Sequence, residues 1–379
     1  MNFDLSEEQE AIAATVRHIL AKEIDGARRL DALSSTNDHD VLLWKSLVGC
    51  GVAGIVAPES RGGSGLGLLE AALVAQEIGG AAAPVPYWGH TLACLAIAAG
   101  GTDEQRARWL PGLATGELLG TVALAERGGH WLPSEWELVT GDALHGSKVF
   151  VPNVAAADLF VVGLAGGSLA VVEAGPRLQT TPVAGSDRTR NGGEVKFAGV
   201  LAEVLPAADA EAVVDAGLVL LAADAFGGAE ACLERSVEYS LTREQYGVPI
   251  GSFQAVKHQL ADVAVELEQS RALWWYAAHA WDALPHARLR AAMLAKMHLA
   301  DLYVRASRTA VEVHGGLGFT WDFDLHVWVR RAVYDQAFLC DSRRLRQLLA
   351  ADAGWCDPRD EGVPVRFESI NRSEVQEWK

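Results

Sequence analysis

The chain is poor in positive charge and in long apolar runs. Its 379 residues carry 32 Lys and Arg against 49 Asp and Glu, a formal net charge of −17. Nucleic acids and anionic membrane surfaces bind proteins through Lys and Arg, so this balance argues against both as partners. No uninterrupted apolar run reaches the ~18 residues that span a bilayer, and no basic segment followed by an apolar one opens the sequence. We therefore expect a cytoplasmic protein without a membrane or nucleic-acid partner.

Cysteine is also scarce, and its distribution excludes two further classes. The five cysteines are scattered over the whole chain and contain no CxxC pair, which indicates neither a disulfide framework nor a metal site. Half of the residues are apolar, which is enough for a sizeable buried core. A chain of this length is expected to form two or three domains.

The periodicity of apolar residues changes twice along the chain. From Leu5 to about Leu113 it is helical, with Ser6 as the expected N-cap of the first helix. Short β-rich runs separated by Gly, Pro and Asp follow as far as Pro206. From Asp209 long helices return, over Ala212–Leu241, Phe253–Ala283 and Ala287–Val313. The pattern predicts a mostly α protein with an inserted β domain: a helical domain at 1–118, a central β domain at 119–207, a helical bundle at 208–352 and an irregular tail at 353–379.

Two segments of the bundle combine glycines with polar side chains. In Leu241–Gln254, LTREQYGVPIGSFQ, Arg243 ends a helix and the chain breaks at Gly247. The Arg243 guanidinium can pair with a pyrophosphate in bidentate fashion, or it can simply stabilise the helix dipole. In Val311–Arg331, VEVHGGLGFTWDFDLHVWVRR, His314 directly precedes a glycine cluster. Glycines of this kind let backbone N–H groups approach a ligand closely, whereas a lone histidine at a helix end is commonly only a polar cap.

Together the two segments resemble the RxQ(F/Y)G, FQ and HGGxG signatures of the acyl-CoA dehydrogenase family, and PExxGGxG from Pro58 is typical of its N-terminal domain. The resemblance extends over nearly the whole chain. It implies an N-terminal helical domain, a central β-barrel-like domain and a C-terminal four-helix bundle, with FAD as cofactor and an acyl-CoA as substrate. In this family the signatures bind the ADP half of a FAD that is seated mainly in the neighbouring subunit. The cofactor-binding residues implied here are Arg243, Gln245, Tyr246, Phe253, Gln254, His314, Gly315, Gly316 and Gly318.

The family's catalytic carboxylate is missing. In the common layout it lies about 20 residues beyond HGGxGF, where this chain has Leu339, followed by Cys340 and Asp341. The family's alternative position, on the first helix of the bundle, corresponds to Gly217. No catalytic base can be assigned; Asp335 and Glu211 are the candidates for a relocated one. The sequence otherwise favours surface or capping positions for the nearby carboxylates Glu211, Asp224, Asp335 and Asp341. It favours a solvated or interface face for His326, Arg330 and Arg331.

The segments that hold the flavin ring in this family are altered as well. The family motif (T)EPxxGSD is replaced by LAERGGHW at Leu124–Trp131, which keeps the Glu and loses the hydroxyl and the GSD. The family's Ile/Thr-Thr-Asn segment is replaced by Val151-Pro152-Asn153. The half of the flavin site that reaches across a subunit interface is therefore intact, and the half that holds ring, substrate and base is not.

This asymmetry resembles one subunit of the α2β2 acyl-CoA dehydrogenases of actinobacterial type, including those that act on steroid side-chain CoA thioesters. The first hypothesis is a companion subunit, which oxidises acyl-CoA to trans-2-enoyl-CoA only with a homologous subunit that supplies ring pocket and glutamate. The second is a self-sufficient homotetramer with a relocated base, and the third a flavin-free, non-redox acyl-handling protein. For either dehydrogenase we expect an electron-transfer flavoprotein as electron acceptor.

Overall fold

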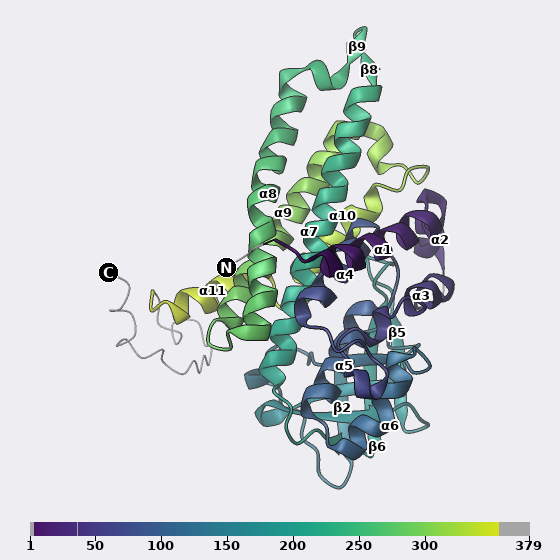
Figure 1. The fold of residues 1–379 in the computed structure, drawn as a ribbon, viewed down its shortest axis with the longest axis vertical. Helices are drawn as coiled ribbons and strands as arrows, with labels where there is room; N and C mark the ends of the chain where they lie inside the picture. Colours follow the sequence, from purple (N-terminus) through teal and green to yellow (C-terminus); the bar gives the residue numbers. More distant parts are fainter. Residues whose placement is uncertain (1–3, 36, 356–379) are drawn as a thin grey trace.

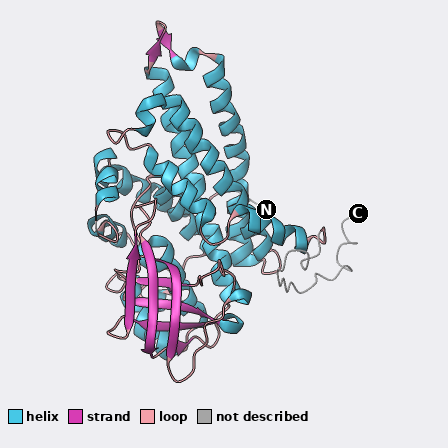
Figure 2. Cartoon of the chain, turned by 180° about the vertical axis from the view of Figure 1, so that it is seen from behind, coloured by secondary structure: helices cyan, strands magenta, loops and turns pink. Residues whose placement is uncertain are grey.

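The computed structural model describes residues 4–35 and 37–355, which form a helical region, a pair of β-sheets and a helical bundle in chain order (Figures 1 and 2). The fold class expected from the sequence is confirmed. Of the irregular tail expected at 353–379, all but the first three residues lie outside the described part of the chain.

The N-terminal region is built from six α-helices. Ser6 caps the first of them as expected: its side chain accepts the backbone N–H of Gln9, and the Gln9 side chain accepts the backbone N–H of Ser6. The fifth helix is buried over almost its whole length, because nearly all of its side chains are apolar. The helices are α1 (Glu7–Glu23), α2 (Gly26–Ser34), α3 (Val41–Val48), α4 (Leu68–Gly80), α5 (Tyr87–Gly100) and α6 (Asp103–Ala114).

The central region holds two sheets that face each other across an apolar core. One has the strand order β1-β3-β4-β7, with β1 parallel to β3, and the other the order β2-β6-β5. Phe160 and Val162 from the first sheet pack with Val151 and Val195 from the second. Two strands, β5 and β7, were not expected from the sequence. The strands are β1 (Gly120–Ala123), β2 (Leu144–Pro152), β3 (Leu159–Leu164), β4 (Ser168–Glu173), β5 (Leu178–Val183), β6 (Gly192–Val200) and β7 (Glu203–Val204).

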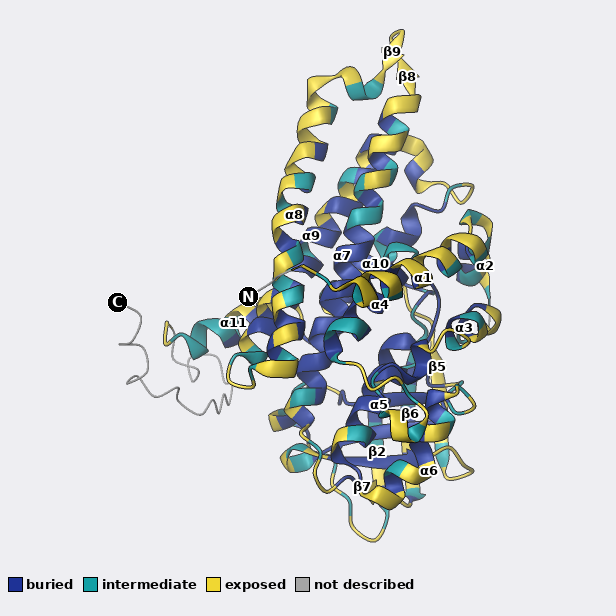
Figure 3. Ribbon diagram, viewed as in Figure 1, coloured by how far each residue is buried: buried dark blue, intermediate teal, exposed yellow. Residues whose placement is uncertain are grey.

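The C-terminal region is a bundle around the long helix α7, which is buried over most of its length (Figure 3). By length and composition α7 is apolar enough to cross a membrane, but its most apolar window is entirely buried in the protein, as in the core helix of a globular fold. The expected helices start and end within two residues of the observed ones. The elements are α7 (Ala210–Thr242), α8 (Gln254–Ala283), α9 (Arg288–His314), α10 (His326–Ala337) and α11 (Ser342–Asp352), with a hairpin of β8 (Glu244–Gln245) and β9 (Val248–Pro249) between α7 and α8.

Close contact between α4 and α7 joins the bundle to the N-terminal region. A Cβ atom on Gly79 would lie 2.1 Å from the carbonyl oxygen of Asp224, and one on Gly227 would lie 1.9 Å from that of Gln76. No side chain fits at either distance, so only glycine permits this crossing. The crossing fixes the position of α7, which carries residues of both halves of the candidate site described below.

Candidate functional site

The hairpin β8–β9 projects from one end of the bundle (Figure 1). Its two turn residues, Tyr246 and Gly247, both have positive φ angles, 56° and 79°, as a two-residue turn that matches the twist of a hairpin requires. Glycine adopts this conformation freely, whereas a tyrosine in it is strained. The Tyr246 side chain is 95% exposed, so packing against the described residues does little to offset the strain.

The polar groups at this tip are free to bind a ligand. The Arg243 backbone N–H donates to the carbonyl oxygen of Tyr239, but within the described residues its guanidinium makes no hydrogen bond or ion pair. The side chain of Gln254, at the start of α8, is likewise exposed and unpaired there. Phe253 is 38% exposed and meets the Tyr246 ring edge-on at 6.2 Å. Gln245 differs, because its amide nitrogen donates to the carbonyl oxygen of Glu244.

The glycine cluster lies at the same end of the bundle as the hairpin. His314 is the last residue of α9, and Gly315, with φ 61°, opens a 3-10 turn (Gly315–Phe319). Gly315 and Gly316 are exposed, whereas Gly318 is buried. The His314 ring stacks on Tyr239, one turn before Arg243, with a centroid distance of 4.3 Å. The end of α7 and the end of α9 are therefore in contact.

The His314 side chain points into the protein, not toward the tip. It is buried, and its Nδ1 lies 2.7 Å from the carbonyl oxygen of Ala310, so this nitrogen carries the proton and donates. Burial lowers the pKa of His314. The structure thus keeps a neutral imidazole inside the bundle and presents the backbone of the exposed glycines instead.

The loop that follows the glycine cluster exposes two large aromatic rings. Phe319 is 73% and Trp321 64% exposed. Asp324 anchors the loop from below by accepting hydrogen bonds from Arg29, at 2.7 Å, and from Arg235. Exposed aromatic rings on an anchored loop are typical of a surface that binds another protein chain.

The position of the missing base is closed and apolar. Leu339 lies between α10 and α11 and is 1% exposed. A Cβ atom on Gly217, the alternative base position, would lie 2.9 Å from Cδ2 of Leu339 and 2.9 Å from the Trp88 ring. The Trp88 indole N–H also donates to the carbonyl oxygen of Gly217, at 3.0 Å. Both positions at which the family places its carboxylate therefore meet in one apolar contact.

A buried lysine supports the turn that carries Leu339. Leu339 and Cys340 have positive φ angles, 52° and 77°, which are strained for residues other than glycine. Lys296 of α9 is fully buried, and its ammonium group donates to the carbonyl oxygens of Gln336, at 3.0 Å, and of Cys340. Burial lowers its pKa to about 8. The sequence offered one signal for this residue, a lone lysine in the apolar run AAMLAKMHLA.

The first candidate for a relocated base, Asp335, belongs to a buried ionic cluster. Arg331 donates to Asp224 at 2.9 Å, and Arg190 lies 3.4 Å from an Asp335 carboxylate oxygen. Burial raises the pKa of Asp335, whereas the two guanidinium groups lower that of Asp224 to about 2. The expectation of surface or capping positions for Asp224 and Asp335 is wrong. A solvated face is likewise wrong for Arg331 and for His326, which is 7% exposed. Asp224, Asp335 and Arg331 are buried because α10 packs its charged face against α7.

The other carboxylates are exposed, cap a helix or are paired with a cation. Glu211 is exposed in the first turn of α7, and Asp341 caps α11 by accepting the backbone N–H of Arg344, as expected for a capping group. Asp215 is buried and pairs with Arg288 at 2.8 Å, and burial raises its pKa to about 7. Residues two positions apart in an α-helix are separated by about 200° around its axis. Asp215 therefore faces α9, whereas Gly217 faces Leu339.

Four aromatic side chains contact one another in series where the β region meets the bundle; we call them the aromatic cluster. Trp88 and Phe338 are buried, Trp131 is half-buried and Phe150 is 58% exposed. The Trp131 ring stacks on Phe150 at 5.3 Å and 24° and meets Phe338 edge-on at 5.1 Å, and Phe338 in turn meets Trp88 edge-on at 5.1 Å. Beside the cluster the structure leaves an enclosed cavity of about 30 Å³, the space of one water molecule. The sequence showed that the family motif was altered at Trp131, but not that aromatic rings occupy the site.

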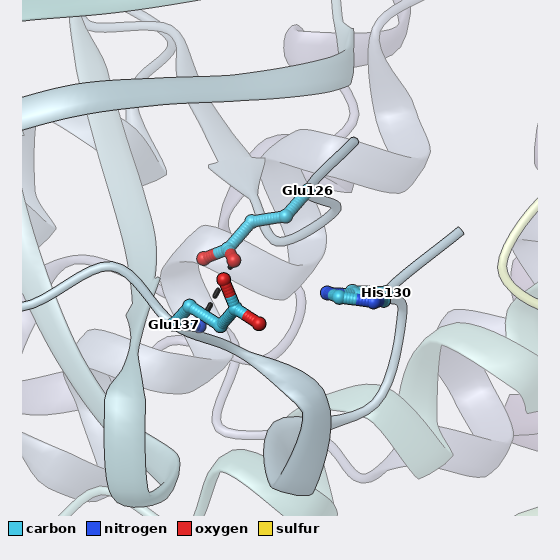
Figure 4. A group of neighbouring side chains, drawn as sticks. All are labelled: Glu126, His130 and Glu137. Carbon is cyan, nitrogen blue, oxygen red and sulfur yellow. Dashed lines mark hydrogen bonds between the residues drawn. The ribbon is translucent and has the colours of Figure 1, made fainter. Parts of the chain in front are cut away.

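The Glu126 that survives from the family motif is used inside the β region. Its carboxylate accepts from the buried Lys148 ammonium at 2.6 Å and from the backbone N–H groups of Glu137 and Leu138. Ligand atoms of Glu126, His130 and Glu137 lie within 4.8 Å of one another (Figure 4). A cation there would have to compete with Lys148 for Glu126, so the group is better explained as the support of this loop than as a metal site.

Comparison with known proteins assigns the family. Residues 210–351 match the model of the acyl-CoA dehydrogenase C-terminal domain, and residues 6–117 that of the N-terminal domain. The chain is 32% identical over 345 residues to acyl-CoA dehydrogenase IpdE2 of Mycobacterium tuberculosis, covering 90% of this chain and 96% of the relative. It is 30% identical over 363 residues to an acyl-CoA dehydrogenase of Bacillus subtilis, covering 88% of this chain and 94% of the relative. The chain belongs to the acyl-CoA dehydrogenase family, whose members are FAD-dependent oxidoreductases acting on CH–CH bonds.

Two solved structures extend the likeness to assemblies of two different chains. A variant of the Tcur3481–Tcur3483 steroid acyl-CoA dehydrogenase contains a chain 32% identical to this one, with a TM-score of 0.85, covering 92% of this chain and 99% of the other. The ChsE4–ChsE5 complex of Mycobacterium tuberculosis contains a chain that is 26% identical to this one, with a TM-score of 0.85. The match covers 94% of this chain and 100% of the other.

The two halves of the candidate site differ in how well they fit FAD. The tip offers a free guanidinium, a free amide and exposed backbone at Gly315 and Gly316, which suit the pyrophosphate and adenosine of the cofactor. The ring segments fit less well, because they lack the hydroxyls of the family motifs and carry the stacked rings of Trp131 and Phe150.

Proposed function

We propose that this chain is the companion subunit of a heteromeric FAD-dependent acyl-CoA dehydrogenase. It supplies the ADP-binding tip to a homologous subunit, and that subunit supplies the ring pocket and the catalytic carboxylate. One observation carries the proposal: Leu339 and Gly217, the two positions for the family's base, contact each other and are both apolar. In a complete site a bound flavin accepts a hydride from the β-carbon of the acyl thioester while a carboxylate takes the α-proton. Leucine and glycine cannot take that proton.

Two further observations support a heteromer. Within the part of the chain that the structure describes, the side chains of Arg243 and Gln254 make no hydrogen bond or ion pair, which suits a ligand brought by another chain. The similar steroid acyl-CoA dehydrogenase and the ChsE4–ChsE5 complex each contain two differently named chains. We therefore expect an α2β2 tetramer, an electron-transfer flavoprotein as acceptor, and a CoA thioester of steroid origin as the first substrate class to test.

The test compares the chain alone with the chain co-expressed with a homologous acyl-CoA dehydrogenase subunit that keeps the catalytic Glu. We expect the chain alone to purify without stoichiometric FAD and without acyl-CoA oxidation, and the co-purified pair to be yellow and active. Flavin in full stoichiometry and activity in the chain alone would refute the companion role and favour the homotetramer with a relocated base. A protein that stays colourless with every partner would favour the flavin-free alternative.

A variant at the tip separates its role from that of the fold. Arg243→Met should lower FAD retention by the pair, because it removes a charge-assisted contact to the pyrophosphate. Arg290→Met is the matched control: Arg290 is 53% exposed and lies at the opposite end of α9 from His314, next to Asp352. Equal FAD loss from both variants would contradict the role of Arg243.

A further inference from the structure

Trp131 lies where three segments of the chain meet. These are the altered family motif (Leu124–Trp131), the end of strand β2 with the residue that follows it (Val149–Asn153), and the turn at the missing base (Phe338–Asp341). The indole contacts both of the others, by stacking on Phe150 and by edge-on contact with Phe338. In the family the first two segments hold the flavin ring and the third carries the base that faces it. The indole therefore lies in the space that the flavin ring needs.

We propose that the Trp131 indole takes the place of the flavin ring in this chain and thereby excludes flavin from the chain's own ring site. The inference rests on the proposed function and deepens it, because it names the residue that keeps flavin out of this chain's own ring site. A planar bicyclic ring stacked on Phe150 replaces the packing that a planar tricyclic ring would supply.

Several contacts fix the indole in this position. The Trp131 backbone N–H donates to Glu135 at 3.0 Å, and its carbonyl oxygen accepts from the Trp136 indole N–H at 3.3 Å. Glu135 in turn accepts from Arg344 of α11, at 2.8 Å, so the β region and the bundle hold the loop together. On the other side Phe150 has a φ of 53° in an irregular stretch of β2, between Lys148 and Val151. Such strain is retained where the surroundings impose it.

The charge beside the indole opposes a dinucleotide. An open groove of about 660 Å³ runs past Trp131, and its charged lining consists of Glu135, Glu137 and Asp341 against the single cation Arg344. Three carboxylates and one guanidinium leave an excess of negative charge, which repels a pyrophosphate. If the indole is removed, the vacated space should accept a neutral isoalloxazine more readily than FAD.

The experiment is a riboflavin titration of the Trp131→Ala variant of the full chain, followed by quenching of flavin fluorescence. We expect riboflavin to bind at least about tenfold more tightly than to the wild type, and more tightly than FAD does. Trp275→Ala is the matched control, since Trp275 is also half-buried and packs edge-on against an aromatic ring, that of Trp274, but in α8. Its riboflavin affinity should equal that of the wild type.

A folded Trp131→Ala variant that binds riboflavin no better than the wild type overturns the proposal. If the alanine variant does not fold, Trp131→Leu keeps an apolar side chain of smaller area. Failure of both variants to bind riboflavin, when it is present during folding, overturns the proposal equally. The proposed function fails on a different result, namely a wild-type chain that no acyl-CoA dehydrogenase subunit joins, and that result leaves the Trp131 test intact.

Discussion

Restoring the family's carboxylate at the missing base position should destabilise this chain in a pH-dependent manner. Leu339 is 1% exposed and packs where Gly217 and Trp88 leave no space. A Leu339→Glu side chain therefore loses an apolar contact and buries a carboxyl group, while the ammonium of the neighbouring Lys296 is already held by the carbonyl oxygens of Gln336 and Cys340. If burial raises the pKa of the new carboxyl by about 3 units, the ionised form costs about 4 kcal/mol of unfolding free energy at pH 8.

The pH dependence isolates the charge from the lost packing. A carboxyl whose pKa is raised in the folded state binds its proton more tightly there, so stability falls as pH rises from the unfolded value of about 4.3 through the folded one. The control is Leu339→Gln, because glutamine has nearly the same shape as glutamate but carries no charge. In urea unfolding followed by tryptophan fluorescence, the gap between the Glu and Gln variants should widen by about 3 kcal/mol between pH 5 and pH 8. A gap that stays constant over this range would show that the carboxylate reaches water, and it would refute the closed site.

Two further variants test the buried lysine and the strained tip. The pKa of Lys296 falls from 10.5 to about 8 in the folded protein. The unfolding free energy of the wild type should therefore rise by up to about 3 kcal/mol relative to that of Lys296→Met between pH 8 and pH 10.5. A pH-independent difference between the two in urea unfolding would contradict this burial of charge. Tyr246→Asn should leave the isolated chain as stable or stabilise it by up to about 1 kcal/mol, since asparagine tolerates positive φ, yet it should speed FAD release from the pair. Calorimetry and flavin fluorescence measure the two effects, and unchanged FAD release would exclude Tyr246 from the cofactor contact.

Most of the fold could be predicted because long, strongly periodic segments specify their own secondary structure. The limits of α7, α8 and α9 fall within two residues of the predicted ones, and the Ser6 cap of α1 is confirmed. Strand β5 was missed because its residues are almost all exposed and show no apolar alternation. Strand β7 was missed because it has only two residues.

The site could be predicted only where a motif has fixed spacing. Counting from the glycine cluster placed Leu339 at the position of the base, and the structure shows an apolar contact there. The buried ion pair between Arg331 and Asp224 could not be found in this way, because the two residues are 107 positions apart and charged residues are commonly exposed. The aromatic cluster likewise joins α5, the β region and the loop after α10, and only the tertiary fold brings these together.

The two halves of the candidate site also differ in whether their residues stabilise the isolated chain. A ring site that no longer holds flavin would be a cavity, and each 100 Å³ of empty space costs about 2.4 kcal/mol. Buried rings such as those of Trp88 and Phe338, which close such space, therefore stabilise the protomer. The tip differs, because among the described residues the strained and 95% exposed Tyr246 contributes little packing and Arg243 makes no ion pair. Folding alone explains the filled ring site but not the tip, and the tip thus points to a ligand or a chain outside this protomer.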